Sequence, residues 1–327
     1  MVTVLITGGA GFIASHLIEH IIRCTKWNIV CIDKLSYASK GFNRLKDSGV
    51  FYNPRLTTLT WDLEHPFTEG LITELGNINI IIHMAADTHV DYSIANPVEV
   101  IRNNVMSTVY LLEYGRKLSN LHMFQYFSTD EVFGPAYGDM DFKETDPHCP
   151  TNPYSASKAA AEDICLAYQN TYQLPLIITN LMNVYGERQY AFNFIPHLIK
   201  NILDNKTIDI HTEEDGTIGS RFYIHARNVA SAVLFILEHG KSGEKYNIRG
   251  EKRVTNLELA QLVANIIGKE LKYNLINNPP NRPFHDAHYS ICGDKLINLG
   301  WQIPVDFEKS LTKSVKWTLE HQEWLEL

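Results

Sequence analysis

An apolar, strand-like run at residues 2–7 leads directly into a glycine turn and then into an apolar helical pattern that continues through Ile22. The turn reads Gly8-Gly9-Ala10-Gly11-Phe12-Ile13-Ala14. A strand, a glycine turn and a helix in this order provide the structural context that makes a short glycine motif informative. We therefore expect an α/β fold that begins with a parallel sheet.

The strand and helix patterns continue to alternate after this first unit. Strand-like runs follow at 28–32, 56–61, 78–84, 121–127 and 175–180, with helical patterns at about 97–117 and 153–172. The run 78–84 is apolar apart from Asn79 and His83, which is typical of a strand buried on both faces of a parallel sheet. Such alternation predicts a Rossmann-type doubly wound parallel sheet.

The pattern loosens after residue 181 into short strands mixed with helices. With 327 residues the chain can form two lobes rather than one sheet alone. We expect a dinucleotide-binding domain at 1–181, to which residues 222–249 cross back, and a smaller mixed α/β substrate-binding lobe at 182–327.

The glycine turn is suited to a dinucleotide. Gly8 and Gly11 let the backbone bend tightly and approach a pyrophosphate, whose charge rests on the helix N-terminus at Phe12 and Ile13. Ala14 stands where the third glycine of the fingerprint would be. Alanine is small enough for the close packing of helix against strand that this position requires. A lone glycine turn also occurs by chance, so the motif depends on its neighbours.

Asp33 supplies the second part of the dinucleotide pattern. It ends the second strand at about the interval of roughly 20 residues where an acid receives the ribose 2′-hydroxyl of NAD. This acid disfavours a 2′-phosphate, although the adjacent Lys34 leaves NADP open. Asp33 alone could be a turn residue, but the order and spacing of the motif predict NAD as the cofactor.

Further candidates follow the later strands of the predicted sheet. Ala85 and Ala86 are small enough to let the chain pass close to a cofactor, and Asn104 is the polar exception on a helix. His83 lies within an apolar run and is interpreted as a core histidine. The expected cofactor contacts here are Asp62 (alternatively a cap of the next turn), Leu63, Ala85, Ala86 and Asn104; the expected substrate contacts are Asp87 and His89, with a solvated loop as the alternative.

The apolar run 121–127 delivers a hydroxyl and two carboxylates at its end, in Ser128-Thr129-Asp130-Glu131. Ligands of open α/β sheets sit at the carboxyl ends of strands. Tyr154 and Lys158 then lie four residues apart at the start of a helical pattern, on one face. An ammonium beneath a phenol lowers the phenol's pKa, so we predict Tyr154 as a base near neutral pH.

Together these motifs resemble the extended short-chain dehydrogenases/reductases that act on nucleotide sugars. The residues that carry the resemblance are Gly8-x-x-Gly11-x-x-Ala14, Asp33, Tyr154-x-x-x-Lys158 and Asn183-x-Tyr185-Gly186. Within that family, Ser128-Thr129-Asp130-Glu131-Val132-Phe133-Gly134 is similar to the dTDP-glucose 4,6-dehydratases and their UDP-glucose counterparts. The similarity extends through Arg282-Pro283-x-His285-Asp286 and Leu299-Gly300-Trp301.

The resemblance implies a reaction and a role for each residue. Tyr154 would remove the proton of the sugar 4-hydroxyl, with Thr129 orienting it, while hydride passes from carbon 4 to NAD. Glu131 would take the hydrogen on carbon 5, and protonated Asp130 would protonate the departing 6-hydroxyl. The hydride then returns to carbon 6, giving a 4-keto-6-deoxy sugar. The resemblance also implies a cofactor contact at Val184 and substrate contacts at Asn183, Asn193, Arg221, Arg282 and His285.

Five positions depart from the family pattern. Asp87 stands where these dehydratases usually have Glu, and Tyr92 where they usually have Arg. Phe192-Asn193 replaces a Glu-Lys pair, and Gly219 replaces a diphosphate-binding Arg, for which Arg221 could substitute. The nucleotide (dTDP, UDP, CDP or GDP) and the sugar therefore remain open, with dTDP-glucose and UDP-glucose ranked first.

Two alternatives share the scaffold. A nucleotide-sugar epimerase or decarboxylase would use Tyr154, Lys158 and NAD without needing an acid at Asp130. A non-enzymatic dinucleotide sensor or a nucleic-acid-binding relative of the fold would need neither carboxylate. The net charge of −8 gives no basic footprint for nucleic acid.

Composition sets the remaining expectations. The five cysteines are odd in number and scattered, without metal-ligand spacing, so we expect reduced thiols and no metal. The first strand begins at residue 2 and no apolar run approaches membrane-spanning length, so we expect a cytoplasmic protein without membrane contact. A homodimer is expected through the helices near 97–117 and 153–172.

Overall fold

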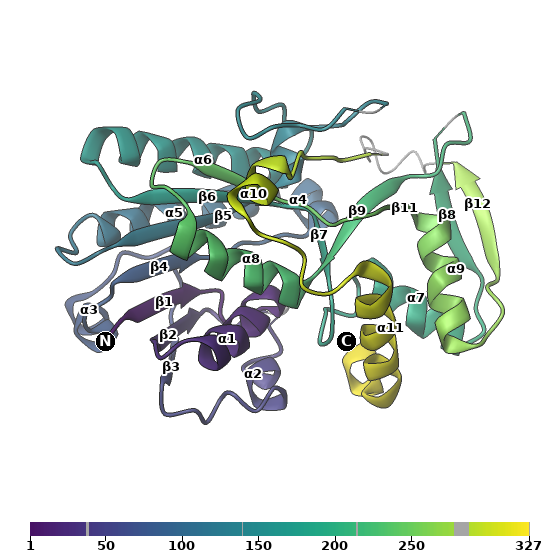
Figure 1. The fold of residues 1–327 in the computed structure, drawn as a ribbon, viewed down its shortest axis with the longest axis horizontal. Coiled ribbons are helices and arrows are strands. Elements are labelled where there is room, and N and C mark those ends of the chain that lie inside the picture. Colours follow the sequence, from purple (N-terminus) through teal and green to yellow (C-terminus); the bar gives the residue numbers. More distant parts are fainter. Residues whose placement is uncertain (37–38, 139, 214, 278–287, 327) are drawn as a thin grey trace.

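The computed structural model describes residues 1–36, 39–138, 140–213, 215–277 and 288–326. Its central feature is a seven-stranded sheet of order β10-β6-β5-β4-β1-β2-β3, with all neighbours parallel (Figure 1). This confirms the predicted Rossmann-type sheet. The strands are β1 (Thr3–Thr7), β2 (Asn28–Asp33), β3 (Leu56–Thr60), β4 (Ile80–His83), β5 (Met123–Thr129), β6 (Leu176–Leu181) and β10 (Lys245–Ile248).

Each face of the sheet is covered by its own helices. Val4 and Ile6 of β1 belong to the core under one helical layer, whereas Leu5 belongs to the core on the other face. Successive side chains of a strand point to opposite faces, so a strand between two helical layers has to be apolar at each position. The layers are α1 (Phe12–Cys24) and α8 (Ala226–His239) on one face, and α3 (Glu69–Leu75), α5 (Pro97–Gly115) and α6 (Pro153–Tyr172) on the other.

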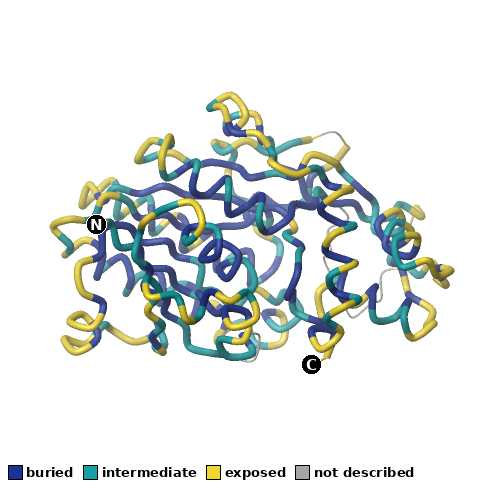
Figure 2. Tube along the Cα trace, turned by 60° about the horizontal axis from the view of Figure 1, so that its bottom comes forward, coloured by how far each residue is buried: buried dark blue, intermediate teal, exposed yellow. Residues whose placement is uncertain are grey.

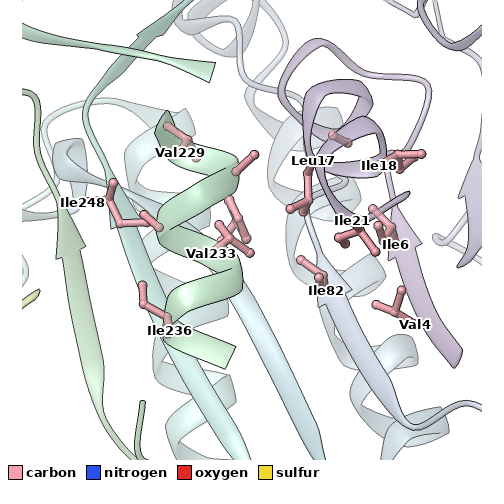
Figure 3. Packing of buried hydrophobic residues seen from close by; sticks show 14 of the residues in the cluster. Val4, Ile6, Leu17, Ile18, Ile21, Ile82, Val229, Val233, Ile236 and Ile248 are labelled. Atoms are coloured by element: carbon pink, nitrogen blue, oxygen red, sulfur yellow. The ribbon is translucent and has the colours of Figure 1, made fainter. Parts of the chain in front are cut away.

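In the first layer, the apolar side chains of α1 and α8 pack onto the sheet. Leu17 and Ile21 of α1 pack beside Val233 of α8 over the strand residues Ile6 and Ile82 (Figure 3). Burying an aliphatic side chain of this size contributes about 1.5–3 kcal/mol. The burial is concentrated along the strands and the inward sides of these helices, while the loops are exposed (Figure 2). A rigid sheet therefore carries the loops at its edge.

A smaller lobe lies beside the carboxyl ends of the large sheet (Figure 1). Its core is formed by residues of two small sheets and of the helices around them. The lobe contains β7 (Asn183–Tyr185), β8 (Ile208–Thr212), β9 (Ser220–His225), β11 (Arg253–Thr255), β12 (Tyr273–Asn277), α7 (Phe194–Leu203), α9 (Asn256–Ile267) and α11 (Phe307–Glu320).

Shorter elements connect these parts. The chain returns from the lobe through β9 and α8 to β10, which pairs in parallel with β6 of the large sheet.

No helix in the described ranges is long and apolar enough to span a bilayer. The remaining elements are α2 (Asn43–Asp47), α4 (Val90–Ala95), α10 (Asp294–Leu299) and the 3-10 turns η1 (Asp130–Phe133) and η2 (Gln322–Leu325).

Candidate active site

Strand β5 ends in Thr129, and the chain turns at once into η1. The Thr129 hydroxyl accepts a hydrogen bond from the backbone N–H of Glu131 (3.4 Å) and donates one to Oδ1 of Asp130 (3.1 Å). Gly134 closes the turn with a φ of +80°, and a Cβ there would overlap the carbonyl oxygen of Cys149. The turn therefore holds one hydroxyl and two carboxylates at the edge of the sheet.

Asp130 is the buried member of the carboxylate pair. Its side chain is only 5% exposed, and Oδ2 has no hydrogen-bond partner among the described residues. Burial raises the pKa of Asp130 to about 6, against the hydrogen bond from Thr129 and the charge of Arg221, which lower it. A carboxyl group in this range can hold a proton near neutral pH and act as a general acid.

Helix α6 presents Tyr154 and Lys158 from its first two turns. Asn152 caps the helix by accepting from the N–H of Ser155 (2.9 Å), and the Ser155 hydroxyl accepts from the N–H of Asn152 (3.2 Å). The same Asn152 side chain donates to Oε2 of Glu131 (3.1 Å). One capping residue thus fixes both the start of the helix and one of the carboxylates.

The prediction that Lys158 lowers the pKa of Tyr154 is wrong for the protein chain alone. Burial raises the pKa of Tyr154, the charges of Glu131 and Asp130 raise it further, and a hydrogen bond with Thr129 opposes them. The Lys158 ammonium instead donates to the carbonyl of Phe127 (2.6 Å), and burial lowers its pKa to about 8. The chain thus places an ammonium in the site without directing it to the phenol.

A cavity of about 470 Å³ lies over this edge of the sheet. It brings together residues from the glycine turn, the ends of β2, β4, β5 and β6, and the start of α6. The predicted site residues that line it are Gly8, Gly11, Phe12, Ile13, Asp33, Lys34, Leu63, Ala85, Ala86, Asp87, His89, Thr129, Asp130, Glu131, Tyr154, Lys158, Asn183, Val184 and Asn193.

The glycine turn leaves space where a dinucleotide needs it. Gly8 has a φ of +67°, and a Cβ there would lie 2.8 Å from Cα of Ala85. Gly11 is the N-cap of α1 and has no side chain that could accept from the first N–H groups of the helix. The first helical residues, Phe12 and Ile13, line the cavity, so this helix N-terminus is available to a pyrophosphate. Asp33 is fixed by the N–H groups of Ala10 (3.0 Å) and Leu35 (2.7 Å), and burial raises its pKa. These residues fit a dinucleotide.

Two predicted cofactor contacts do not line the cavity. Asp62 accepts from the N–H of Glu64 (3.0 Å), so it caps a turn as the alternative interpretation had it. Asn104 is buried and is used by its neighbours: it accepts from the N–H of Asp87 (2.7 Å) and donates to Ser157 (2.9 Å). The adjacent residues Trp61 and Asn103 line the cavity in their place.

Arg44 is a lining residue that sequence reasoning missed. Its buried guanidinium donates to the carbonyls of Arg188 (2.9 Å) and Ser39 (2.8 Å), and burial lowers its pKa to about 10. It lies in a polar stretch without periodicity or a motif, so no sequence signal marked it. By contrast, His83 is the core histidine that was predicted, bonded to Thr7 (2.7 Å) and Thr108 (3.1 Å).

A second cavity of about 1240 Å³ continues from the first into the smaller lobe. It shares His89, Glu131, Asn183 and Asn193 with the first cavity and adds Arg221, whose guanidinium lies over the ring of Tyr289 at 4.8 Å. The predicted substrate contacts Arg282 and His285 lie outside the described residues. No group of three potential metal ligands occurs in the described ranges.

Comparison with known proteins agrees with this geometry. The family model for GDP-mannose 4,6 dehydratase matches residues 5–314. A dTDP-glucose 4,6-dehydratase of Neisseria gonorrhoeae is 35% identical over 338 residues, covering 98% of this chain and 96% of the relative. A solved dTDP-glucose 4,6-dehydratase from Streptomyces venezuelae, with NAD and dTDP bound, superposes with a TM-score of 0.89 at 30% identity, covering 99% of both chains.

A plant relative has a different length. The trifunctional UDP-glucose 4,6-dehydratase, 3,5-epimerase and reductase of Arabidopsis thaliana is 35% identical over 324 residues. That match covers 98% of this chain but only 48% of the plant protein, so the chain spans about half the length of this relative. By the family match over residues 5–314 and its near full-length similarity to the bacterial relative, the chain belongs to the nucleotide-sugar 4,6-dehydratases of the extended short-chain dehydrogenase/reductase family.

Proposed function

We propose that the protein removes water across carbons 5 and 6 of a nucleoside-diphosphate glucose and gives the 4-keto-6-deoxy sugar, a reaction of deoxysugar metabolism. The observation that carries this proposal is the pair Asp130 and Glu131 in one cavity with Tyr154. Loss of water needs both an acid for the departing hydroxyl and a base for the proton on carbon 5, whereas an epimerase or decarboxylase on this scaffold would not need the acid at Asp130. NAD, when bound, supplies the hydride acceptor for carbon 4 and the hydride donor for carbon 6.

The first task of the chain is to deprotonate the sugar 4-hydroxyl. Tyr154 lines the cavity, and its hydrogen bond with Thr129 links it to the hydroxyl that would orient the sugar. Because burial raises the pKa of Tyr154, the phenol needs positive charge nearby to act as a base. Lys158 places an ammonium in the same cavity, although it donates to the carbonyl of Phe127 in the protein chain alone. NAD, when bound, would add the positive charge of its nicotinamide ring.

The second task is elimination. Glu131, oriented by the Asn152 amide, takes the proton on carbon 5, which the new ketone makes acidic, and can return it to carbon 5 once carbon 6 has received the hydride. Asp130, with its pKa raised to about 6 by burial, gives its proton to the departing 6-hydroxyl. Two neighbouring carboxyl groups can divide these tasks because their surroundings differ.

The second cavity supports the assignment of the substrate class. It continues from the catalytic edge into the smaller lobe and is large enough for a nucleoside diphosphate. Arg221, at its wall, is proposed to contact the diphosphate, and His89, Asp87, Asn183 and Asn193 to contact the sugar end. We rank dTDP-glucose and UDP-glucose first, with Arg282 and His285 as further proposed contacts.

Incubation of the purified protein with separate nucleotide sugars tests the proposal. The set is dTDP-glucose, UDP-glucose, UDP-N-acetylglucosamine, CDP-glucose and GDP-mannose, each analysed by mass spectrometry. The expected result is a product lighter by one water from one of them. Isomerisation without loss of mass, or loss of carbon dioxide, would instead establish the epimerase or decarboxylase alternative and refute the roles of Asp130 and Glu131.

We further propose a homodimer formed through α5 and α6. These two helices pack against each other on one face of the sheet, and Val98 (78% exposed), Ile101 and Tyr172 leave apolar surface on them. Light scattering of the purified protein measures the mass, and a monomer at micromolar concentration would refute the dimer.

A cytoplasmic location is also proposed. All five cysteines are free, which is typical of proteins kept in a reducing compartment. Fractionation of the source cells checks this location.

A further inference from the structure

A buried ion cluster that none of the proposed chemical steps uses lies behind the candidate active site. Glu162 is on α6, one turn after Lys158, and its side chain is 0% exposed. Its Oε1 accepts hydrogen bonds from Nε2 of His148 (3.1 Å) and from Nζ of Lys245, and its Oε2 accepts from Nδ2 of Asn180 (3.2 Å). These partners keep the buried carboxylate ionised, and the pKa of Glu162 is lowered to about 2 although burial opposes this.

His148 stands between two carboxylates of α6. Its Nε2 faces Oε1 of Glu162 (3.1 Å), and its Nδ1 faces Oδ1 of Asp163 (3.3 Å). Ionised carboxylates only accept hydrogen bonds, and a neutral imidazole has a single N–H. A neutral ring can donate to one of these two carboxylates only. The hydrogen bond to Glu162 and the ion pair with Asp163, whose side chain is 66% exposed, are therefore both favourable only when the ring carries two protons and a positive charge.

The groups around His148 favour that charge. The hydrogen bond to Glu162 raises the pKa of His148 most, and Asp163 adds to the effect, whereas burial and the charge of Lys245 on β10 lower it. The ring of Phe133 from η1 packs against the imidazole with the centroids 6.0 Å apart and carries no charge. The net direction is upward.

The segment 148–152 connects this cluster to the proposed elimination base. The N–H of Cys149 donates to the carbonyl of Val132 in η1 (2.8 Å). At the end of the segment, Asn152 caps α6 and donates to Oε2 of Glu131 (3.1 Å). His148 thus anchors one end of a five-residue segment whose other end orients Glu131.

We propose that His148, as an imidazolium held between Glu162 and Asp163, is a positioning residue for Glu131. It fixes the segment 148–152 and, through the Asn152 amide, the direction of the Glu131 carboxylate. This inference rests on the proposed function, in which Glu131 takes the proton from carbon 5. Loss of the ring proton leaves a nitrogen lone pair facing a carboxylate, so the anchor weakens.

The pH range of the effect follows from the sign of the shift. The folded protein holds the His148 proton more tightly than the unfolded chain does, because the pKa is raised from 6.5. The anchoring contribution is therefore complete below the ordinary pKa of histidine and is lost as the pH rises through the higher pKa of the folded state.

The test compares wild type with two variants that remove the titration in opposite ways. His148→Arg keeps a permanent charge and two donors for the two carboxylates, and His148→Gln keeps a neutral donor only. Single turnovers are followed between about pH 6 and pH 9, on either side of the ordinary histidine pKa. Rapid-quench mass spectrometry measures water loss, and cofactor absorbance measures the preceding oxidation at carbon 4.

We expect His148→Gln to lose water about tenfold more slowly at neutral pH, as expected for a displacement well below 1 Å, with oxidation and KM unchanged. His148→Arg should retain the rate, and the ratio of wild-type to His148→Arg water loss should fall as His148 deprotonates. That ratio cancels the titrations of Asp130 and Tyr154. His122→Gln, at an exposed histidine, is the control and should match wild type at each pH.

An NMR titration provides a second readout that does not depend on turnover. The ring signals of His148 should titrate above the ordinary histidine pKa, and the side-chain amide of Asn152 should shift with the same midpoint in wild type but not in His148→Arg. A flat rate ratio, or an Asn152 amide that ignores the His148 titration, overturns the proposal. If wild type dehydrates none of the sugars, the proposed function and the role of Glu131 fail together, while the Asn152 signal still decides whether His148 holds the segment.

Discussion

Replacing the buried acid Asp130 by asparagine should remove the loss of stability that ionisation of Asp130 causes as the pH rises, while it damages the reaction. Asp130 is 5% exposed, and its pKa is raised from 3.8 to about 6 by burial. The folded state therefore binds the carboxyl proton more tightly than the unfolded state. Stability contributed by the protonated group is complete below pH 3.8 and is lost as the pH rises through about 6.

The shift sets the size of the effect. A rise of about two pKa units, at about 1.4 kcal/mol per unit, corresponds to roughly 3 kcal/mol of unfolding free energy. Asp130→Asn abolishes this loss because the amide does not ionise, and its Oδ1 can still accept from Thr129. Its buried NH₂ takes the place of Oδ2, which has no hydrogen-bond partner among the described residues. Leaving this NH₂ unpaired costs about 1–3 kcal/mol at each pH. The part of the stability difference that changes with pH therefore reports the titration of Asp130 alone.

Urea unfolding of wild type and Asp130→Asn at a series of pH values measures this difference. We expect the variant to gain about 2.5 kcal/mol relative to wild type between pH 4 and pH 7.5. Glu238→Gln, at an exposed carboxylate of α8, is the matched control and should show little change. A difference between Asp130→Asn and wild type that stays constant with pH would refute the raised pKa of Asp130.

The same variant should lose the elimination step selectively. A positioned general acid typically contributes 10²–10⁴-fold, so water loss should slow by about 10²-fold or more. Oxidation at carbon 4 does not need Asp130 and should continue, which leaves reduced cofactor visible by absorbance. Unchanged water loss in Asp130→Asn would show that another group protonates the 6-hydroxyl.

Three further substitutions test the other parts of the site. Tyr154→Phe removes the phenol and should abolish turnover with NAD still bound, so retained activity would disprove the base. Asp33→Ala leaves the N–H groups of Ala10 and Leu35 without their acceptor and should lower the NAD content of the purified protein; unchanged content would remove the ribose contact. Gly8→Ala forces a Cβ to within 2.8 Å of Cα of Ala85 at a positive φ and should lower both Tm and NAD content, whereas a wild-type melting curve would contradict the close approach.

The large sheet could be predicted because its residues obey a local rule. A strand that is covered on both faces has to be apolar at successive positions, and the run 78–84, with the buried residues Ile80, Ile81 and Ile82, shows this in the sequence itself. The glycine turn could also be predicted from the sequence. Gly8 has a positive φ and lies close to Ala85, so the position tolerates no side chain and requires glycine. Such constraints act on neighbouring residues or on one residue type, so they leave a visible pattern.

The sequence does not indicate the contacts of side chains whose partners are distant in the chain. Asn104 was predicted to contact the cofactor because it is polar on an apolar helix. In the structure its side chain forms hydrogen bonds with the backbone of Asp87 and with the Ser157 hydroxyl. Lys158 was expected to face the phenol of Tyr154, but its ammonium donates to the carbonyl of Phe127. Residue spacing places two side chains on one face of a helix, and it does not choose between the acceptors that the sheet offers them.

The carboxylate pair shows how two adjacent residues can receive opposite tasks. The chain changes direction between β5 and η1, so Asp130 turns into the protein, where Oδ2 finds no partner among the described residues. Glu131 is less buried and receives the Asn152 amide, a donor that favours the ionised form of a carboxylate. Burial favours the protonated form of Asp130. The hydrogen bond from the Asn152 amide favours the ionised form of Glu131. An acid and a base can therefore stand side by side because a single turn of the backbone gives them different surroundings.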